Sequence, residues 1–188
     1  MRLAIRLGGA GGHGIALAGL ILAEAAVAAG RRVVCTQAHG PESRGGASRS
    51  DLIISDERVA FPVPRRLDVL AVLTREAWER SRHALAPEGV AIVDAGCVAG
   101  AEGEAREAAA PYALPILETA RAIGGSTRGA NMVMLGLLCE LTGVVPAGLL
   151  ADAAARRVPE ASRTANLAAL DAGRKLAAAR RRDGAAAS

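Results

Sequence analysis

The chain has 188 residues, of which 51% are hydrophobic and 22% charged, and this balance predicts a globular fold with one sizeable core. It excludes a disordered, collagenous or acidic-tail protein. The formal net charge is only +4, and the aromatic residues are Phe61, Trp78 and Tyr112 alone, so nucleic-acid bases would find few rings to stack on. We therefore expect no nucleic-acid partner.

The N-terminal segment predicts a strand, a helix and a second strand in close succession. Residues 2–7 alternate basic and apolar side chains, and residues 15–29 form an Ala/Leu-rich run that ends at Gly30. Residues 33–37 should form a strand parallel to the first through a right-handed crossover. After a loop punctuated by Gly and Pro, residues 47–55 resume an extended pattern.

The central segment predicts further buried strands. Residues 68–74 are a continuous apolar run, typical of a strand covered on both faces, and a polar helix over 75–85 separates it from another strand at 90–94. Residues 99–110 have no usable periodicity. The fold class expected from this pattern is α/β, a Rossmann-like three-layer sandwich with a mostly parallel sheet and C-terminal helices.

The C-terminal segment predicts helices only. Pro115 introduces one over 116–123, Pro146 opens another that ends near Arg157, and an amphipathic helix covers 160–180. Between them, residues 129–142 form an almost uniformly apolar helix closed by Gly143, which must be buried. We expect a single domain over residues 1–180 and a basic, disordered tail over 181–188.

The cysteines and the apolar runs point to a reduced, cytoplasmic compartment. Cys35, Cys97 and Cys139 lie too far apart for an iron–sulfur or zinc motif and do not resemble a disulfide framework. The longest apolar stretches fall short of the roughly 18 residues that a membrane span needs. Gly8 and Gly9 interrupt the apolar run that a signal peptide requires. We expect no membrane association and no metal ligand.

The first candidate site is a glycine cluster between the first strand and the first helix. Gly9, Gly11 and Gly14 form a G-x-G-x-x-G pattern with Gly12 inside it, and such turns expose the N–H groups of a helix start to phosphate. A dinucleotide is one interpretation, although the next strand ends at Gln37 rather than at an acidic residue that would hold a ribose. Close packing of the helix on the strand is the other.

The second candidate site is the loop over residues 39–46, with the sequence His-Gly-Pro-Glu-Ser-Arg-Gly-Gly. As a catalytic loop it would use His39 and Glu42 as acid and base, but no nucleophile or metal ligand accompanies them, so we assign no catalytic residue. As a binding loop it would use Arg44 for a carboxylate or phosphate, with Gly45 and Gly46 permitting close approach. A plain surface loop or subunit contact is the third interpretation.

Several motifs together resemble the gamma subunit of the 2-oxoacid:ferredoxin oxidoreductases, and the resemblance runs from residue 3 to about 176. Within that family the chain is most similar to the 2-oxoglutarate type, with His39 in place of a usual Tyr and His13 in place of a usual Gln. The motifs are Gly9 to Gly14, residues 39–50, Phe61-Pro62 with residues 68–71, and residues 130–136 with 141–145.

The resemblance implies a subunit of an enzyme that decarboxylates a 2-oxoacid oxidatively with CoA, giving an acyl-CoA and passing electrons to ferredoxin. For the 2-oxoglutarate type the product is succinyl-CoA. Thiamine diphosphate and 4Fe–4S clusters would belong to alpha, beta and possibly delta partners, so this chain alone would bind no cofactor. It would pack on the catalytic subunits near the CoA site. The alternative is a free-standing Rossmann-like nucleotide-binding module or an NAD(P)-dependent dehydrogenase.

Overall fold

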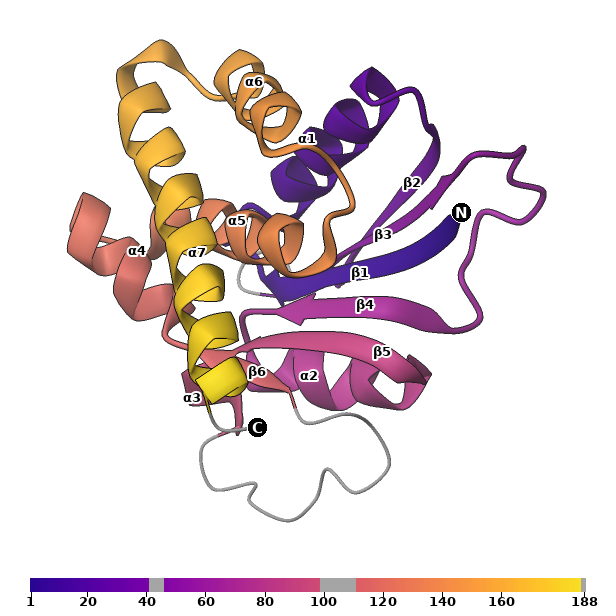
Figure 1. The fold of residues 1–188 in the computed structure, drawn as a ribbon, viewed down its shortest axis with the longest axis horizontal. Coiled ribbons are helices and arrows are strands. Elements are labelled where there is room, and N and C mark those ends of the chain that lie inside the picture. The colour runs from indigo at the N-terminus through magenta and orange to yellow at the C-terminus, as the bar shows by residue number, and fades with distance from the viewer. Residues whose placement is uncertain (41–45, 99–110, 187–188) are drawn as a thin grey trace.

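The computed structural model describes residues 1–40, 46–98 and 111–186, and in these ranges the chain forms a six-stranded sheet between two layers of helices (Figure 1). The strand order is β2-β3-β1-β4-β5-β6. The strands are β1 (Arg2–Ala10), β2 (Arg32–His39), β3 (Ala47–Ser55), β4 (Leu67–Val72), β5 (Leu85–Asp94) and β6 (Tyr112–Leu114). This is the expected three-layer α/β sandwich.

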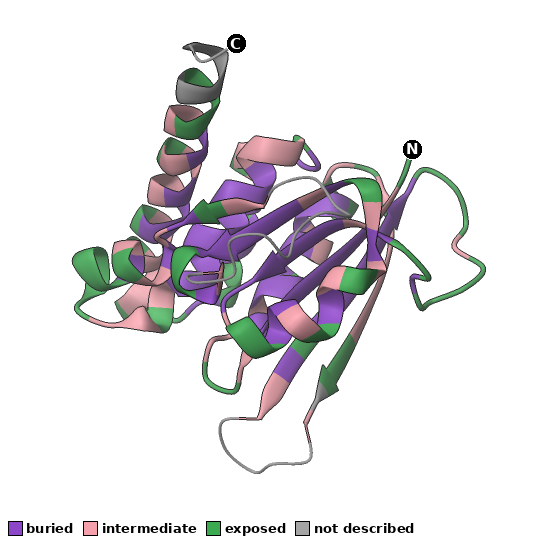
Figure 2. Ribbon diagram, turned by 90° about the horizontal axis from the view of Figure 1, so that it is seen from below, coloured by how far each residue is buried: buried purple, intermediate pink, exposed green. Residues whose placement is uncertain are grey.

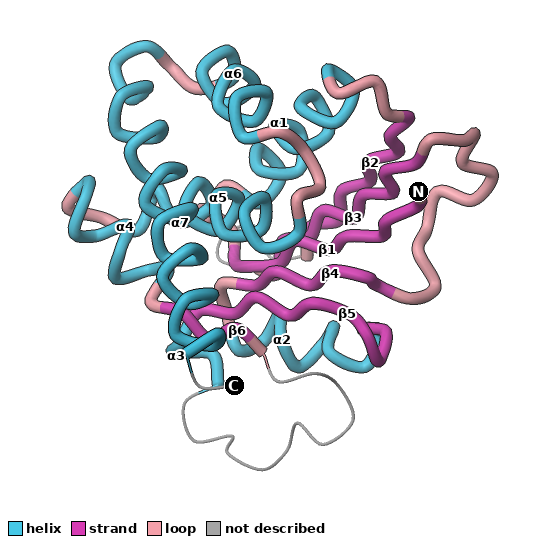
Figure 3. Tube along the Cα trace, in the orientation of Figure 1, coloured by secondary structure: helices cyan, strands magenta, loops and turns pink. Residues whose placement is uncertain are grey.

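The sheet is mixed because β3 runs against its neighbours. β1, β4, β5 and β6 pair in parallel, whereas β3 pairs antiparallel with both β1 and β2. Figure 3 shows β3 between these two neighbours. The strand expected at 33–37 therefore runs in the direction of β1, as predicted, but it does not lie beside β1. A short hairpin joins β2 to β3, and β3 occupies the place next to β1 over the whole length from Arg2–Ser55 to Ala10–Ala47.

Helices cover both faces of the sheet. One layer contains α1 (Ile15–Ala28), α4 (Ile116–Gly124), the 3-10 turn η2 (Thr127–Gly129), α5 (Ala130–Thr142), α6 (Ala147–Arg157) and α7 (Glu160–Ala186). The other layer contains α2 (Arg75–Ser81), the 3-10 turn η1 (Arg82–Ala84) and α3 (Ala95–Val98). Buried residues follow the central strands and the helix faces turned toward them (Figure 2).

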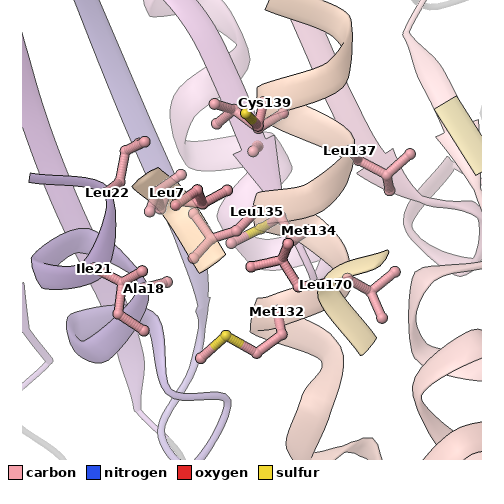
Figure 4. Close-up of a cluster of buried hydrophobic side chains, with 14 of the residues drawn as sticks. Leu7, Ala18, Ile21, Leu22, Met132, Met134, Leu135, Leu137, Cys139 and Leu170 are labelled. Atoms are coloured by element: carbon pink, nitrogen blue, oxygen red, sulfur yellow. The ribbon is translucent and has the colours of Figure 1, made fainter. Parts of the chain in front are cut away.

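Helix α5 is the centre of the larger core. Every residue from Ala130 to Cys139 is buried, which confirms the expectation for this uniformly apolar segment. Its side chains lie between α1 on one side and Leu170 of α7 on the other (Figure 4). Gly143 ends the helix in the left-handed conformation, with φ of 63°, as its position predicted.

Two glycines let α5 and α7 approach backbone to backbone. A Cβ at Gly136 of α5 would lie 2.0 Å from the carbonyl oxygen of Leu170, and a Cβ at Gly173 of α7 would lie 2.0 Å from the carbonyl oxygen of Val133. Real carbon atoms do not come that close to a carbonyl oxygen. The two helices can keep this crossing only while both positions lack a side chain.

Some boundaries differ from the sequence-based expectations. β1 continues through Gly8 and Gly9 to Ala10, because the full-length pairing with β3 holds these glycines in the sheet. Helix α7 continues past Arg180 to Ala186, so residues 181–186 of the expected tail belong to a helix, and 187–188 lie outside the described residues. Residues 99–110 also lie outside them. None of the described helices is long and apolar enough to cross a membrane.

We predict that Gly136→Ala destabilises the protein by about 3 kcal/mol or more, because the new methyl group meets a backbone carbonyl that cannot rotate away. Chemical denaturation of the purified chain measures this. Gly148→Ala in α6 is the matched control, since its Cβ would meet nothing within 4 Å, and it should be neutral or stabilising by up to about 1 kcal/mol. Equal stability of the two variants would show that the helices do not cross at Gly136.

Candidate functional site

The candidate site lies at one end of the sheet, where the carboxyl ends of the parallel strands meet. Ala10, Val72 and Asp94 end β1, β4 and β5 there. The antiparallel β3 begins at the same end, with Ala47 opposite Ala10, and β2 ends there at His39. Ligands of open α/β sheets bind at this edge.

A hydrogen bond joins the two motifs that the sequence singled out. The N–H of Gly11 donates to the carbonyl oxygen of Gly46 over 2.7 Å, which ties the glycine turn to the hairpin. The structure therefore brings Gly9, Gly11, Gly12 and Gly14 together with Gly46. Gly11 and Gly12 are exposed. The other two predicted binding residues, Arg44 and Gly45, lie outside the described residues, as does Glu42.

Packing and backbone conformation account for three of the glycines. A Cβ at Gly9 would lie 3.0 Å from the Cδ1 of Ile15, and a Cβ at Gly14 would lie 2.5 Å from the Nδ2 of Asn131. Gly12 has open space around it but a φ of +92°, which disfavours any other residue. The close-packing interpretation of the motif thus explains Gly9 and Gly14, and the exposed Gly11–Gly12 turn is the part that can face a ligand.

Asn131 is a site residue that the sequence analysis did not identify. It lies in the first turn of α5 with only 2% of its surface exposed, and its Nδ2 donates to the carbonyl oxygen of Gly14 over 3.1 Å. This bond fastens the start of α5 to the start of α1. A polar residue opening an otherwise apolar helix is the signal that could have revealed it.

Asp94 is a second residue that the analysis missed, and it organises the carboxyl end of β5. Its Oδ1 accepts from the N–H of Leu117 over 2.8 Å, and its Oδ2 accepts from the N–H of Gly96 over 3.0 Å. The carboxylate is buried, with 7% exposure. Its two backbone donors belong to α4 and α3, so Asp94 fixes the start of both helices.

Asp94 also acts on His13 of the glycine turn. Burial lowers the pKa of His13, and the attraction of Asp94 for an imidazolium opposes this without reversing it. The Nδ1 of His13 accepts from the N–H of Ala10 over 3.3 Å. Since Nδ1 is the acceptor, the neutral imidazole carries its proton on Nε2. The turn therefore presents an uncharged N–H donor near neutral pH.

The cysteines offer neither a nucleophile nor a cluster. Cys97 and Cys139 are buried, and burial together with Asp94 raises the pKa of Cys97 to about 12, so its thiol stays protonated. Cys35 lies on β2, and burial raises its pKa as well. No three His, Cys, Asp or Glu side chains of the described ranges are grouped so that they could hold a metal ion. These donors do not fit an iron–sulfur cluster.

A cavity of about 210 Å³ lies between α2 and the ends of β2 and β3. Gly8 makes room for α2 there, because a Cβ would lie 3.0 Å from the Cβ of Ala77. Two arginines at the cavity are already engaged: Arg80 pairs with Glu76 at 2.7 Å, and Arg49 contacts Asp51 at 3.4 Å. The cavity therefore has room for a group beside the hairpin, but both of these arginines are already paired with carboxylates.

Asp51 anchors the hairpin to β1 through a buried ion pair. The Nε of Arg6 lies 2.7 Å from the Oδ1 of Asp51, and the second guanidinium nitrogen lies 2.9 Å from Oδ2. Arg6 is 8% exposed and Asp51 2%. The two residues face each other in the β1–β3 register, so the pair holds β3 in place.

The pKa of His13 generates a prediction about pH. Because folding lowers this pKa, the unfolded chain binds a proton more readily, and stability falls as the pH falls below the ordinary His value of about 6.5. The free energy of unfolding should therefore decrease less between about pH 7 and about pH 5 in His13→Gln than in the wild type. His83→Gln is the control, since His83 is exposed. The prediction is wrong if both variants keep the wild-type pH dependence.

The topology disfavours a classical dinucleotide site. Such a site places the second strand beside the first, with its acidic end near the ribose. Here β3 lies between β1 and β2, and Gly46, directly before β3, contacts the glycine turn. The alternative of a nucleotide-binding module or a dehydrogenase therefore loses its structural basis.

The comparisons with known proteins agree with this. The family model for pyruvate ferredoxin/flavodoxin oxidoreductase matches residues 4–176. The 2-oxoglutarate synthase subunit KorC of Methanothermobacter thermautotrophicus is 39% identical over 94% of this chain and 95% of its own length. The gamma subunit of keto/oxoacid ferredoxin oxidoreductase from Geobacter sulfurreducens is 39% identical with a TM-score of 0.84, over 95% of this chain and 98% of that one.

A longer relative has the same fold as part of its chain. The 2-oxoglutarate:ferredoxin oxidoreductase of Magnetococcus marinus, solved with 2-oxoglutarate, coenzyme A and succinyl-CoA bound, is 29% identical with a TM-score of 0.81. The match covers 95% of this chain and 31% of that one. On the family match and the near full-length identity to KorC, the chain belongs to the pyruvate ferredoxin/flavodoxin oxidoreductase family.

Proposed function

We propose that this chain is the gamma, or KorC-type, subunit of a 2-oxoglutarate:ferredoxin oxidoreductase. The observation that carries the proposal is the similarity to KorC, which extends over nearly the whole of both chains. The complete enzyme would convert 2-oxoglutarate and CoA to succinyl-CoA and CO₂, with the two electrons passing to ferredoxin. This chain would serve as an accessory subunit of that multi-subunit enzyme.

The proposal assigns the redox chemistry to other subunits. The described residues of this chain offer no cluster-forming cysteines and no activated nucleophile, so thiamine diphosphate and 4Fe–4S clusters would be held by alpha, beta and possibly delta subunits. The Magnetococcus relative supports this division, because a domain like this chain makes up only about a third of its length. Here the remainder would come from separate polypeptides.

The site end of the sheet would face the CoA of the catalytic subunits. The Gly11–Gly12 turn is exposed, and the hairpin that carries Arg44, Gly45 and Gly46 is fastened to it by the Gly11–Gly46 bond. A guanidinium can hold a phosphate through two parallel charge-assisted bonds, and glycines beside it let a ligand approach the backbone. His13 would add a neutral donor rather than a further charge.

The function is tested by making the complex with and without this chain. We expect the chain purified alone to show no 2-oxoglutarate-dependent reduction of ferredoxin and no visible iron–sulfur absorption. Co-expression with the other subunits should give a complex that contains it and has CoA-dependent activity. An active complex that neither contains this chain nor changes when it is added would refute the proposal, as would an isolated chain that binds NAD(P).

Arg44→Ala tests the binding role of the hairpin. Loss of a charge-assisted phosphate contact costs about 2–3 kcal/mol, so the KM for CoA should rise roughly 30- to 150-fold. Steady-state kinetics of the complete complex measure it. Arg156→Ala on α6 is the control, because Arg156 is an exposed arginine on another element and should keep the wild-type KM.

The same variant separates two roles. If Arg44 holds a subunit contact instead, Arg44→Ala should weaken assembly in gel filtration while the residual complex keeps its wild-type KM for CoA. Wild-type assembly together with a wild-type KM would show that Arg44 contributes neither to CoA binding nor to assembly.

A further inference from the structure

An exposed apolar tip lies at the end of the sheet opposite the candidate site. Residues 56–66, here called the Phe61 loop, join β3 to β4 beside the N-terminus (Figure 1). Phe61 is 74% exposed and Val63 is 60% exposed. Of the other two aromatic residues, Trp78 is only 5% exposed and Tyr112 is half-buried. The single phenylalanine of the chain is thus presented to solvent.

The loop holds this tip in a restricted conformation. Pro62 and Pro64 flank Val63, and each proline fixes its own φ and restricts the residue before it. Pro64 is buried, and Leu67, which begins β4, is fully buried, so the loop is fastened to the body directly after the exposed tip. A tip that is already ordered loses little conformational entropy when a partner covers it.

Arginines surround the tip. Arg2, Arg65 and Arg66 line an open groove of about 790 Å³ together with Phe61 and Val63. Within the described ranges, the side chains of these three arginines make no hydrogen bond or ion pair. The one carboxylate of the groove is Asp68, whose Oδ2 already accepts from the N–H of Ala4 over 2.7 Å. The groove therefore carries a net positive charge, since three guanidinium groups line it with a single carboxylate.

We propose that the Phe61 loop docks onto a neighbouring subunit of the complex, into an apolar pocket with carboxylates at its rim. The inference rests on the proposed function, since it needs a multi-subunit complex. Interface hot spots are enriched in aromatic residues and arginine, which become buried in a pocket of the partner with a polar rim around them. Carboxylates at the rim of the partner's pocket would pair with Arg2, Arg65 and Arg66.

The charge of this surface also argues against a second copy of this chain as the partner that the Phe61 loop contacts. In a twofold contact each loop would face its own copy, so the three arginines of one would meet the three arginines of the other. Like charges brought together in an interface oppose association. The docking surface lies at the amino ends of β1 and β4, whereas the candidate site lies at their carboxyl ends, so the two contacts are separate.

The test measures binding of the purified full chain to the complex of the remaining subunits. Phe61→Ser should weaken binding about 30-fold or more, which is the effect of removing a hot-spot residue. The double variant Arg65→Gln with Arg66→Gln should weaken binding and reduce its dependence on salt. Val27→Ser on α1 is the matched control, because Val27 is 59% exposed but lies on another surface, and it should bind as the wild type does.

The outcomes separate this inference from the proposed function. Failure of the wild-type chain to bind the remaining subunits would overturn the proposed function and, with it, the inference. Wild-type binding by Phe61→Ser, with the wild-type chain itself bound, would overturn the inference alone. Self-association of the isolated wild-type chain that Phe61→Ser abolishes in sedimentation analysis would also overturn it, because the loop would then contact a second copy.

Discussion

The antiparallel pairing of β3 with β1 is the interaction on which the rest of the structure depends. It runs along the whole of β1, and the buried Arg6–Asp51 pair fixes its register. Because β3 starts where β1 ends, this pairing brings Gly46 to the glycine turn and allows the Gly11–Gly46 hydrogen bond. The same pairing displaces β2 to the edge of the sheet and thereby removes the geometry of a dinucleotide site.

Most of the elements could be predicted from the sequence, but not the order of the strands. Apolar periodicity and the glycine and proline signals are local, and they predicted α5 with its closing Gly143 and the extended segment 47–55. The place of β3 depends on which strands exchange hydrogen bonds, and an α/β sequence pattern favours the parallel crossover by default. The predicted direction of β2 is confirmed, but the insertion of β3 between β1 and β2 has no local sequence signal.

Of the described residues at the candidate site, the sequence identified only the glycines as binding residues. Gly9 and Gly14 stand out in the sequence, but their reason is contact with Ile15 and Asn131, and that contact with Asn131 spans more than a hundred residues of chain. In the sequence, Asp94 is only the residue that ends a buried strand, and its hydrogen bonds to two backbone N–H groups are evident only in the structure. Residues whose role is to fasten distant elements leave little local signal, which is why both polar anchors were missed.

The two ends of the sheet carry different kinds of chemistry, and this follows from strand polarity. At the carboxyl ends, exposed backbone at Gly11 and Gly12 and a neutral His13 suit a small ligand that approaches the chain closely. At the amino ends, a proline-restricted Phe61 beside three arginines and a single carboxylate suits a protein surface. A subunit of the proposed kind would attach to a catalytic partner at one end and stand near its ligand at the other. The sheet between the two regions would then fix the distance from attachment to ligand.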